Sequence, residues 1–185
     1  TIPCTILVMI NMAVHIVIDG YNLIRQSAEL SRLDRRDLQE GREALLDMLA
    51  AYKKIKRHQI TVVFDGTDDY SLYRQRDQSK GIRVLFSRRG ETADTVIKRM
   101  AAKEREGALV VSSDRDVADF AAARKAATMS SPDFMDKLSM AAWSEEKGIH
   151  PDEEMTGWNP TTRKKGPSRK LSKKERRNRR KSKKL

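Results

Sequence analysis

The stretch that decides the fold is Val14-His15-Ile16-Val17-Ile18-Asp19-Gly20-Tyr21-Asn22. It opens on β-branched apolar residues, a pattern typical of a strand buried on both faces of a parallel sheet. The apolar run ends at Asp19, and Gly20 permits a sharp turn of the backbone after it. Because parallel α/β sheets hold their ligands beyond the carboxyl ends of their strands, Asp19 is the first candidate functional residue.

Similar apolar runs and amphipathic stretches follow this strand. Further strands are expected at 60–64, 82–86 and 108–112, with a short edge strand at 126–130. Helices are expected at 36–56, 91–105, 113–124 and 132–147, and a polar loop from Gly20 to about Asp34. A strand, a helix and a second strand in this order imply a right-handed parallel crossover. The predicted fold class is therefore α/β, a three-layer Rossmann-like domain with a mostly parallel central sheet.

Charge divides the chain into two unequal parts. Residues 161–185 contain 14 Lys or Arg and one acid, a net charge of +13. The other 160 residues hold 24 basic and 25 acidic residues, which brings the total to +12. A segment so rich in charge cannot bury enough apolar surface to offset its chain entropy, so it is predicted to be disordered. The asymmetry itself points to nucleic acid or another anionic surface.

Four regions follow from these patterns. Residues 1–11 are taken as a leader or a non-native extension, because Met12 stands immediately before the first strand. Residues 12–131 form the α/β domain, and residues 132–158 form a C-terminal helical extension. Residues 159–185 form the disordered basic tail.

The composition excludes several classes of protein. One cysteine, Cys4, cannot form an intrachain disulfide or a zinc knuckle, and the three histidines lack the spacing of metal ligands. The apolar run at 6–10 is far shorter than the ~20 residues that a membrane span needs. No signal-peptide pattern precedes it. The expected location is the cytoplasm, with no membrane partner.

Carboxylates recur where strands end and helices begin. Asp65 and Asp114 each follow a predicted strand, and Asp94 lies in the first turn of a predicted helix, beside its apolar stripe. Acids gathered at one edge of a sheet repel one another unless a cation lies between them. Asp19, Asp94 and Asp114 are therefore the predicted metal ligands.

The neighbouring polar residues have structural explanations as well. Glu91 is evenly balanced between a ligand and a partner of the helix dipole, which favours such an acid by ~0.3–1 kcal/mol. Asp65 fits an outer position of the site or a turn, and Asn22 fits contact with a metal-bound water or phosphate, or a left-handed turn. Ser113 and Asp116 predict a capping box, which leaves Asp116 a lesser candidate.

The ligand types indicate a class of chemistry. Oxygen ligands alone suit Mg²⁺ or Mn²⁺ rather than zinc. Two such ions ~3.5–4 Å apart activate water and stabilise a leaving oxygen, which suits hydrolysis of a phosphodiester. The Gly-x-x-x-x-Gly-Lys phosphate loop and the dinucleotide fingerprint are absent, and no Ser–His or Cys–His nucleophile pair is visible.

Four motifs occur in a diagnostic order: Ile18-Asp19-Gly20-Tyr21-Asn22, Val63-Phe64-Asp65-Gly66, Glu91-Thr92-Ala93-Asp94 and Val111-Ser112-Ser113-Asp114. In this order they resemble YacP-like NYN domains, which belong to the PIN-like nuclease superfamily. The resemblance covers about residues 12–131 and implies a PIN-like fold with metal-dependent endoribonuclease activity. It places Asp19, Asp94 and Asp114 at the family's metal-binding positions. Asn22, Asp65 and Glu91 match the flanking polar positions.

Basic residues predict how RNA would be held. Cations on a flexible tail neutralise phosphates and release counterions, so binding is salt-dependent and independent of sequence. The tail residues expected to bind RNA are Arg163, Lys164, Lys165, Arg169 and Lys170. A second basic rim near the site is expected at Arg74, Arg76, Arg88 and Arg89. A solubility or targeting tail and ordinary solvated charges are the alternatives.

These observations lead to one hypothesis and two alternatives. The hypothesis is a divalent-metal-dependent endoribonuclease that acts on single-stranded or ribosome-associated RNA. The first alternative is a non-catalytic RNA- or ribosome-binding adaptor that keeps the PIN-like fold. The second is a metal-dependent phosphatase acting on small phosphoesters, for which the tail would be superfluous.

Overall fold

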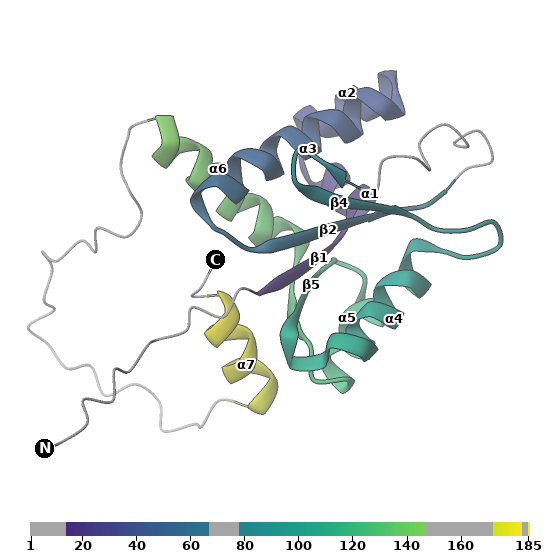
Figure 1. Ribbon diagram of the computed structural model, residues 1–185, viewed down its shortest axis with the longest axis vertical. Coiled ribbons are helices and arrows are strands. Elements are labelled where there is room, and N and C mark those ends of the chain that lie inside the picture. Colours follow the sequence, from purple (N-terminus) through teal and green to yellow (C-terminus); the bar gives the residue numbers. More distant parts are fainter. Residues whose placement is uncertain (1–13, 67–77, 147–171, 183–184) are drawn as a thin grey trace, which may run out of the picture.

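A six-stranded sheet organises the described part of the chain (Figure 1). The computed structural model describes residues 14–66, 78–146, 172–182 and 185. The strand order is β3-β4-β2-β1-β5-β6, and neighbouring strands are parallel except β3, which pairs antiparallel with β4. The mostly parallel sheet predicted from the apolar runs is confirmed.

The central strand of the sheet is β1. The strands are β1 (His15–Asp19), β2 (Gln59–Phe64), β3 (Gln78–Ser79), β4 (Ile82–Phe86), β5 (Ala108–Val111) and β6 (Ala127–Met129). Every residue of β1 is buried, which explains a continuous apolar run in place of an alternating one. Ile18 pairs with Val62 of β2 and with Val111 of β5, so these three strands end at the same edge.

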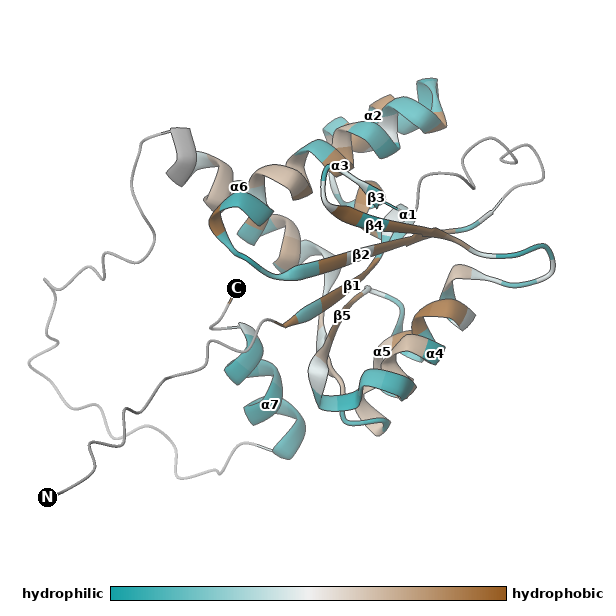
Figure 2. Ribbon diagram, in the orientation of Figure 1, coloured by the Kyte–Doolittle hydropathy of each residue, from teal (hydrophilic) through white to brown (hydrophobic). Residues whose placement is uncertain are grey.

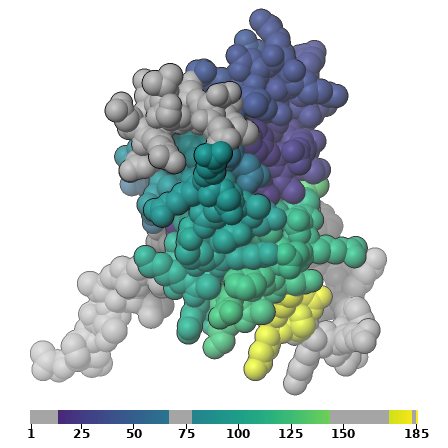
Figure 3. Space-filling view, turned by 90° about the vertical axis from the view of Figure 1, so that its right-hand side faces the viewer, coloured from purple at the N-terminus to yellow at the C-terminus, as the bar shows by residue number. Residues whose placement is uncertain are grey.

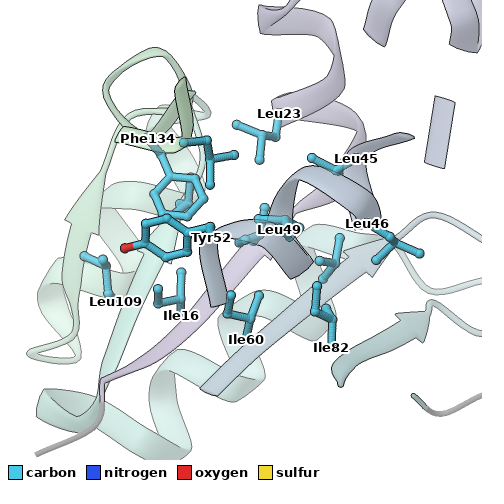
Figure 4. Packing of buried hydrophobic residues seen from close by; sticks show 14 of the residues in the cluster. Ile16, Leu23, Leu45, Leu46, Leu49, Tyr52, Ile60, Ile82, Leu109 and Phe134 are labelled. Atoms are coloured by element: carbon cyan, nitrogen blue, oxygen red, sulfur yellow. The ribbon is translucent and has the colours of Figure 1, made fainter. Parts of the chain in front are cut away.

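Four helices cover one face of the sheet (Figures 1 and 4). They are α1 (Gly20–Gln26), α2 (Ala28–Arg36), α3 (Leu38–Ile55) and α6 (Ser131–Glu146). Tyr52 of α3 and Phe134 of α6 pack edge to face with ring centroids 5.8 Å apart. Both rings belong to one buried cluster with Ile16 of the central strand, as Figure 4 shows.

The opposite face is covered by α4 (Ala93–Glu104) and α5 (Arg115–Ala123). A short 3-10 turn, η2 (Arg105–Gly107), connects α4 to β5. Val17 and Val63 pack there against Ile97 of α4 and Val117 of α5. Figure 2 shows strands coloured mostly as hydrophobic between helices in which hydrophilic and hydrophobic residues alternate. The three-layer architecture predicted from the sequence is confirmed.

The segment after β1 differs from the polar loop that we expected, because it forms α1 and α2. Asp19 begins α1 by accepting a hydrogen bond from the Asn22 amide at 3.1 Å. Ser27 begins α2 in the same way, accepting from the Leu30 amide at 3.3 Å. Both helices are short, and Leu30 is the buried residue of α2. Each helix is too short to show the long apolar stripe from which the other helices were predicted, and most residues of α2 are charged, which is why the prediction was wrong.

Gly20 is needed for close approach and not for the sharp turn that we expected. It is the first residue of α1, and a Cβ atom there would lie 2.2 Å from Cε1 of Phe64. The Phe64 ring is held in turn by Tyr21 and Phe86, whose ring centroids lie 5.1 Å and 5.7 Å away. The absence of a side chain at Gly20 therefore lets α1 start directly against the Phe64 ring.

The basic tail is not disordered throughout, and the prediction was wrong for the residues that form α7 (Lys173–Ser182). A capping box begins this helix. The Ser172 hydroxyl accepts from the Glu175 amide at 3.2 Å, and the Glu175 carboxylate accepts from the Ser172 amide at 2.8 Å. The Ser-x-x-Glu pattern is visible in the sequence and marks the start of this helix. The highly charged composition alone had predicted disorder.

Side-chain bonds dock α7 on the edge strand β6. Asn178 Oδ1 accepts from the Thr128 amide at 3.0 Å, and Asn178 Nδ2 donates to the Thr128 hydroxyl at 3.0 Å. Lys181 Nζ donates to the carbonyl oxygens of Ala108, at 2.7 Å, and of Glu106. Composition counts charges but not the backbone groups that a folded sheet offers, which explains the failed prediction of disorder.

Several predicted features lie outside the described residues. They are the leader at 1–11, the part of the helical extension from 147 to 158, and the basic residues Arg74, Arg76, Arg163, Lys164, Lys165, Arg169 and Lys170. Among the helices that are described, none combines the length and apolarity needed to cross a bilayer.

Candidate active site

The crevice between the ends of β1 and β5 is the topological switch point of the sheet. After β1 the chain enters α1 on one face, and after β5 it enters α5 on the other face. Open α/β sheets bind ligands in the crevice that such a divergence creates at the carboxyl ends of the strands. Asp19 ends β1 and Asp114 begins α5, so two of the predicted ligands lie at this crevice.

Asp19 is a buried carboxylate with only 9% of its surface exposed. One of its oxygens, Oδ1, accepts from the Asn22 amide, and the other lies 3.5 Å from the Ser112 hydroxyl. Burial raises the pKa of Asp19 from 3.8 to about 6, and the charges of Asp94 and Asp65 add to the rise. The ionised form is therefore disfavoured unless a positive charge joins it.

Asp94 lies in the first turn of α4, which Thr92 begins by accepting from the Thr95 amide at 3.3 Å. Burial raises the pKa of Asp94, and the carboxylate of Asp114 raises it further, whereas Lys98 opposes the rise. Within the described part of the chain, the Asp94 carboxylate makes no hydrogen bond. It is therefore open to a cation in the crevice.

Asp114 is the N-cap of α5. Its Oδ1 accepts from the amides of Asp116, at 2.7 Å, and Val117, at 3.4 Å. Its own amide donates to the Ser112 hydroxyl at 3.1 Å. Because both capping bonds use Oδ1, the second carboxylate oxygen of Asp114 is not consumed by the cap.

The capping box predicted from Ser113 and Asp116 is wrong. Asp114 takes the capping position instead, one residue later than expected. The Ser113 hydroxyl accepts from the Ser131 amide at 3.2 Å, and the Asp116 carboxylate pairs with Lys98. The ion pair with Lys98 gives the Asp116 carboxylate a structural partner on α4.

Asp65 and Glu91 each have a structural partner. Asp65 Oδ1 accepts from the Ala93 amide at 2.6 Å and so supports the start of α4. The charge of Asp65 still raises the pKa of both Asp19 and Asp94, so Asp65 lies within electrostatic reach of the two carboxylates. Glu91 forms an ion pair with Arg99, 2.7 Å between Oε1 and Nη1. Its role as a ligand stays a prediction.

Asn22 joins three segments around the crevice. Its Oδ1 accepts from the Ser113 amide at 3.1 Å and from the Ser131 hydroxyl at 2.7 Å. These bonds connect α1 to the loop after β5 and to α6. The Asn22 amide oxygen therefore fixes the shape of the crevice.

Two hydroxyl groups of this network, those of Ser112 and Ser131, were not predicted from the sequence. Ser112 is 4% exposed and links Asp19 to the amide of Asp114, while Ser131 is fully buried beneath Asn22. Ser112 lies inside one of the four motifs, so the sequence could have indicated that it belongs to the site. Nothing in the sequence indicated Ser131, because it lies on α6 and contacts residues that are distant in the sequence.

Another polar group resembles a nucleophile triad but is closed to substrates. His15 Nδ1 lies 2.5 Å from Glu104 Oε2, and His15 Nε2 lies 2.7 Å from the Thr61 hydroxyl. Thr61 is fully buried and His15 is 8% exposed. No substrate reaches such a hydroxyl, so these bonds tie β1 to β2 and α4.

The donor atoms at the crevice fit a hard divalent cation. In the described part of the chain, no three acidic, histidine or cysteine side chains form a ready-made cage for an ion. Mg²⁺ does not need one, because it keeps several waters and binds through one or two carboxylates. The charge of Asp94 raises the pKa of Asp19, and the charge of Asp114 raises the pKa of Asp94. The three carboxylates therefore lie within electrostatic reach of one another.

Arg88 and Arg89 of the predicted basic rim are exposed in the turn after β4. Hydrogen bonds from Ser87 to Phe64 and from Gly66 to Ser87, both 2.9 Å, hold this turn beside the end of β2. The two arginines therefore lie at the carboxyl edge of the sheet, where the rim was expected.

The profile of the YacP-like NYN domain matches residues 16–184 of this chain. The chain belongs to the YacP-like NYN family. The match extends beyond residue 131, where we expected the domain to end, and includes α6 and α7. The NYN family is nuclease-like, in agreement with the expectation from the four motifs.

The relatives of this NYN protein include the uncharacterised protein YacP of Bacillus subtilis (strain 168), 29% identical over 86 residues. That alignment covers 46% of this chain and 50% of YacP, so the chain spans half the length of this relative. The crystal structure of Rae1 (YacP) from Bacillus subtilis matches with a TM-score of 0.61 and 24% identity, covering 72% of this chain and 78% of that chain. The crystal structure of a mutant of Rae1 matches with a TM-score of 0.61 and 22% identity, covering 72% and 80%. These two matches establish the PIN-like fold.

Proposed function

We propose that this YacP-like NYN protein is a divalent-metal-dependent endoribonuclease that hydrolyses RNA phosphodiester bonds. The proposal is carried by the mutual effect of the crevice carboxylates. Burial and neighbouring acids raise the pKa values of Asp19 and Asp94, and a bound cation would relieve both penalties. Acids held at such a cost to stability are typical of functional sites.

Asp19, Asp94 and Asp114 would hold Mg²⁺ or Mn²⁺. Asp94 makes no hydrogen bond within the described residues, and the caps of α1 and α5 engage Oδ1 of Asp19 and Asp114. A bound ion would lower the pKa of a coordinated water molecule and neutralise negative charge on the phosphate. Ser112, bonded to Asp19 and to the Asp114 amide, holds these two acids in register.

RNA is the proposed substrate because of the charge around the crevice. The near-neutral body is joined to a segment of net charge +13, and exposed Arg88 and Arg89 lie at the edge of the sheet that carries the acids. Such cations attract phosphates in a salt-dependent way. We propose that the protein acts in the cytoplasm on single-stranded RNA, either free or associated with the ribosome.

The deciding experiment incubates the purified protein with mixed single-stranded RNAs and Mg²⁺ or Mn²⁺. We expect internal cleavage that EDTA abolishes and that Asp19→Asn or Asp94→Asn lowers by at least ~100-fold, because each change removes a ligand charge. Asp47→Asn is the matched control, since Asp47 is an exposed acid paired with Lys80 away from the crevice. Cleavage that survives in the crevice variants, or needs no metal, would contradict the proposal.

A non-catalytic RNA- or ribosome-binding adaptor is the second candidate. It is favoured by the helix-capping bonds of Asp19 and Asp114, since acids with a structural role persist without catalysis. This candidate predicts salt-sensitive RNA binding without cleavage under any metal. A rise in melting temperature on adding Mn²⁺, absent in Asp94→Asn, would count against it, because an adaptor needs no ion.

A further inference from the structure

A surface hollow joins the candidate site to helix α7. Its volume is about 810 Å³. Ser112, Ser113 and Asp114 line one part of it, and Asn178, Arg179 and Ser182 of α7 line another. Figure 3 shows α7, in yellow, beside the green surface of α5 and α6 on the same side of the molecule. The hollow therefore connects Asp114, a predicted metal ligand, with the most basic of the described helices.

Three elements contribute cations to this hollow. Arg115 comes from α5, Lys137 from α6 and Arg179 from α7. Arg115 and Arg179 are exposed and Lys137 is half-buried. The Thr128 hydroxyl, which accepts from Asn178 and keeps its own proton to donate, also lines the surface. Cations with hydroxyl donors between them are the groups that contact phosphate and sugar oxygens.

Two acids also line the hollow beyond the crevice. The Asp133 carboxylate accepts from the Ser130 hydroxyl at 2.6 Å at the start of α6, so its charge serves the helix. Asp136 is exposed and opposes the binding of a phosphate. Neutralising Asp136 should therefore strengthen the binding of RNA, whereas removing one of the cations should weaken it.

The docking of α7 fixes the position of Arg179. The inner side of the helix holds to the domain through Lys174, 3.1 Å from Asp119, and through Arg177, 3.2 Å from the Ala122 carbonyl. Arg179 makes no ion pair within the described residues. A cation on a docked helix loses less freedom on binding a phosphate than a cation on a free tail.

We propose that the hollow is the track along which a single strand of RNA runs between α7 and the carboxylate crevice. This inference rests on the proposed nuclease function, because it assigns the path of the substrate to that site. A volume of about 810 Å³ is in the range of ligand pockets and suits a few nucleotides of one strand. Phosphates of that strand contact Arg179, Lys137 and Arg115.

The test measures binding in a variant that cannot cleave, Asp19→Asn/Asp94→Asn, so that it does not depend on activity. A fluorescent single-stranded RNA is titrated at several salt concentrations. Into this variant we introduce Arg179→Glu or Arg180→Glu. Both residues are exposed arginines of α7, so the change of charge is the same, but Arg179 lines the hollow and Arg180 does not. Circular dichroism verifies that both variants keep their helices.

We expect Arg179→Glu to weaken binding by at least ~10-fold and to reduce the salt slope by ~1, and Arg180→Glu to weaken binding by no more than ~3-fold. On the other wall, Lys137→Glu should weaken binding and Asp136→Asn should strengthen it. These α6 variants keep the proposal testable if Arg179→Glu releases α7.

The two proposals fail in different ways. Equal weakening by Arg179→Glu and Arg180→Glu, with no effect at α6, would overturn the track even if the unmodified protein cleaves RNA. A clear difference between the two arginines supports the track as an RNA-binding surface. If the unmodified protein then cleaves nothing, the nuclease proposal alone is lost.

Discussion

The pKa of Asp19 lies well above that of an exposed aspartate because its carboxyl group is buried beside Asp94 and Asp65. The native state therefore binds more protons than the unfolded chain between about pH 4 and pH 6. Stability falls as the pH rises through this window, since the ionised carboxylate is favoured in the unfolded chain. The difference between 3.8 and about 6 corresponds to roughly 3 kcal/mol at pH 7.

Asp19→Asn is expected to stabilise the protein at pH 7.5 by about 1–3 kcal/mol. Asparagine keeps the N-cap of α1, because Asn and Asp cap helices about equally well. Urea denaturation at pH 7.5 and at pH 4 measures the effect, and the gain should disappear at the lower pH. Asp47→Asn, at an exposed position, should show no such gain. A destabilised Asp19→Asn variant would contradict the desolvation argument.

Gly20→Ala is expected to destabilise the protein by ~1–3 kcal/mol, the usual range for overpacking. The new methyl group would lie 2.2 Å from a ring that Tyr21 and Phe86 hold in place. Chemical denaturation measures the loss. The double variant Gly20→Ala/Phe64→Leu should recover part of it, because leucine lacks the atoms that clash. A Gly20→Ala variant as stable as the parent would show that the ring can move aside.

At the scale of helices and strands, apolar periodicity predicted the sheet and the helices that bury a broad face. The strands at β1, β2, β4, β5 and β6 and the helices α3, α4, α5 and α6 were expected near their observed positions. The helices that were missed are the short α1 and α2, which begin at side-chain caps, and α7, which buries no residue of its own. Antiparallel β3 was missed because two residues carry no period.

Asn178→Ala is expected to loosen α7 from the sheet at a cost of ~1–3 kcal/mol, since the Thr128 amide and hydroxyl lose their partner. Hydrogen exchange at the Thr128 amide measures the change. Asn178→Asp is the matched variant, because it keeps an acceptor for that amide and loses only the donor. It should protect the amide more than alanine does. Equal exchange in both variants would mean that Asn178 does not hold the helix, which would then depend on its lysines and Arg177.

At the scale of the whole molecule, α7 and Leu185 belong to the fold, although they lie in the most positively charged segment of the chain. Leu185 is buried, and its carbonyl oxygen accepts from the Tyr52 hydroxyl at 3.3 Å. Removing residues 172–185 is therefore expected to cost ~2 kcal/mol and to lower the melting temperature by about 4–8 °C. Calorimetry of the two proteins checks this. An unchanged melting temperature would show that this segment does not stabilise the domain.

The candidate site was predictable from the sequence to the extent that strand ends define it. Asp19 and Asp114 follow directly from buried strands, and their place at the crevice follows from the parallel order of β1 and β5. Contacts between elements that are distant in the sequence could not be predicted in this way. The bond from Ser131 to Asn22 joins α6 to α1, and it exists only once the two helices share one face of the sheet.

The cover that α7 provides for β6 has a consequence for chains that are cut short. An open strand edge pairs readily with other chains. Because α7 follows β6 by a long stretch of sequence, a chain truncated by proteolysis before Ser172 keeps the whole sheet and exposes that edge. Such fragments are expected to aggregate through strand pairing. The segment richest in positive charge thus also guards the protein against self-association.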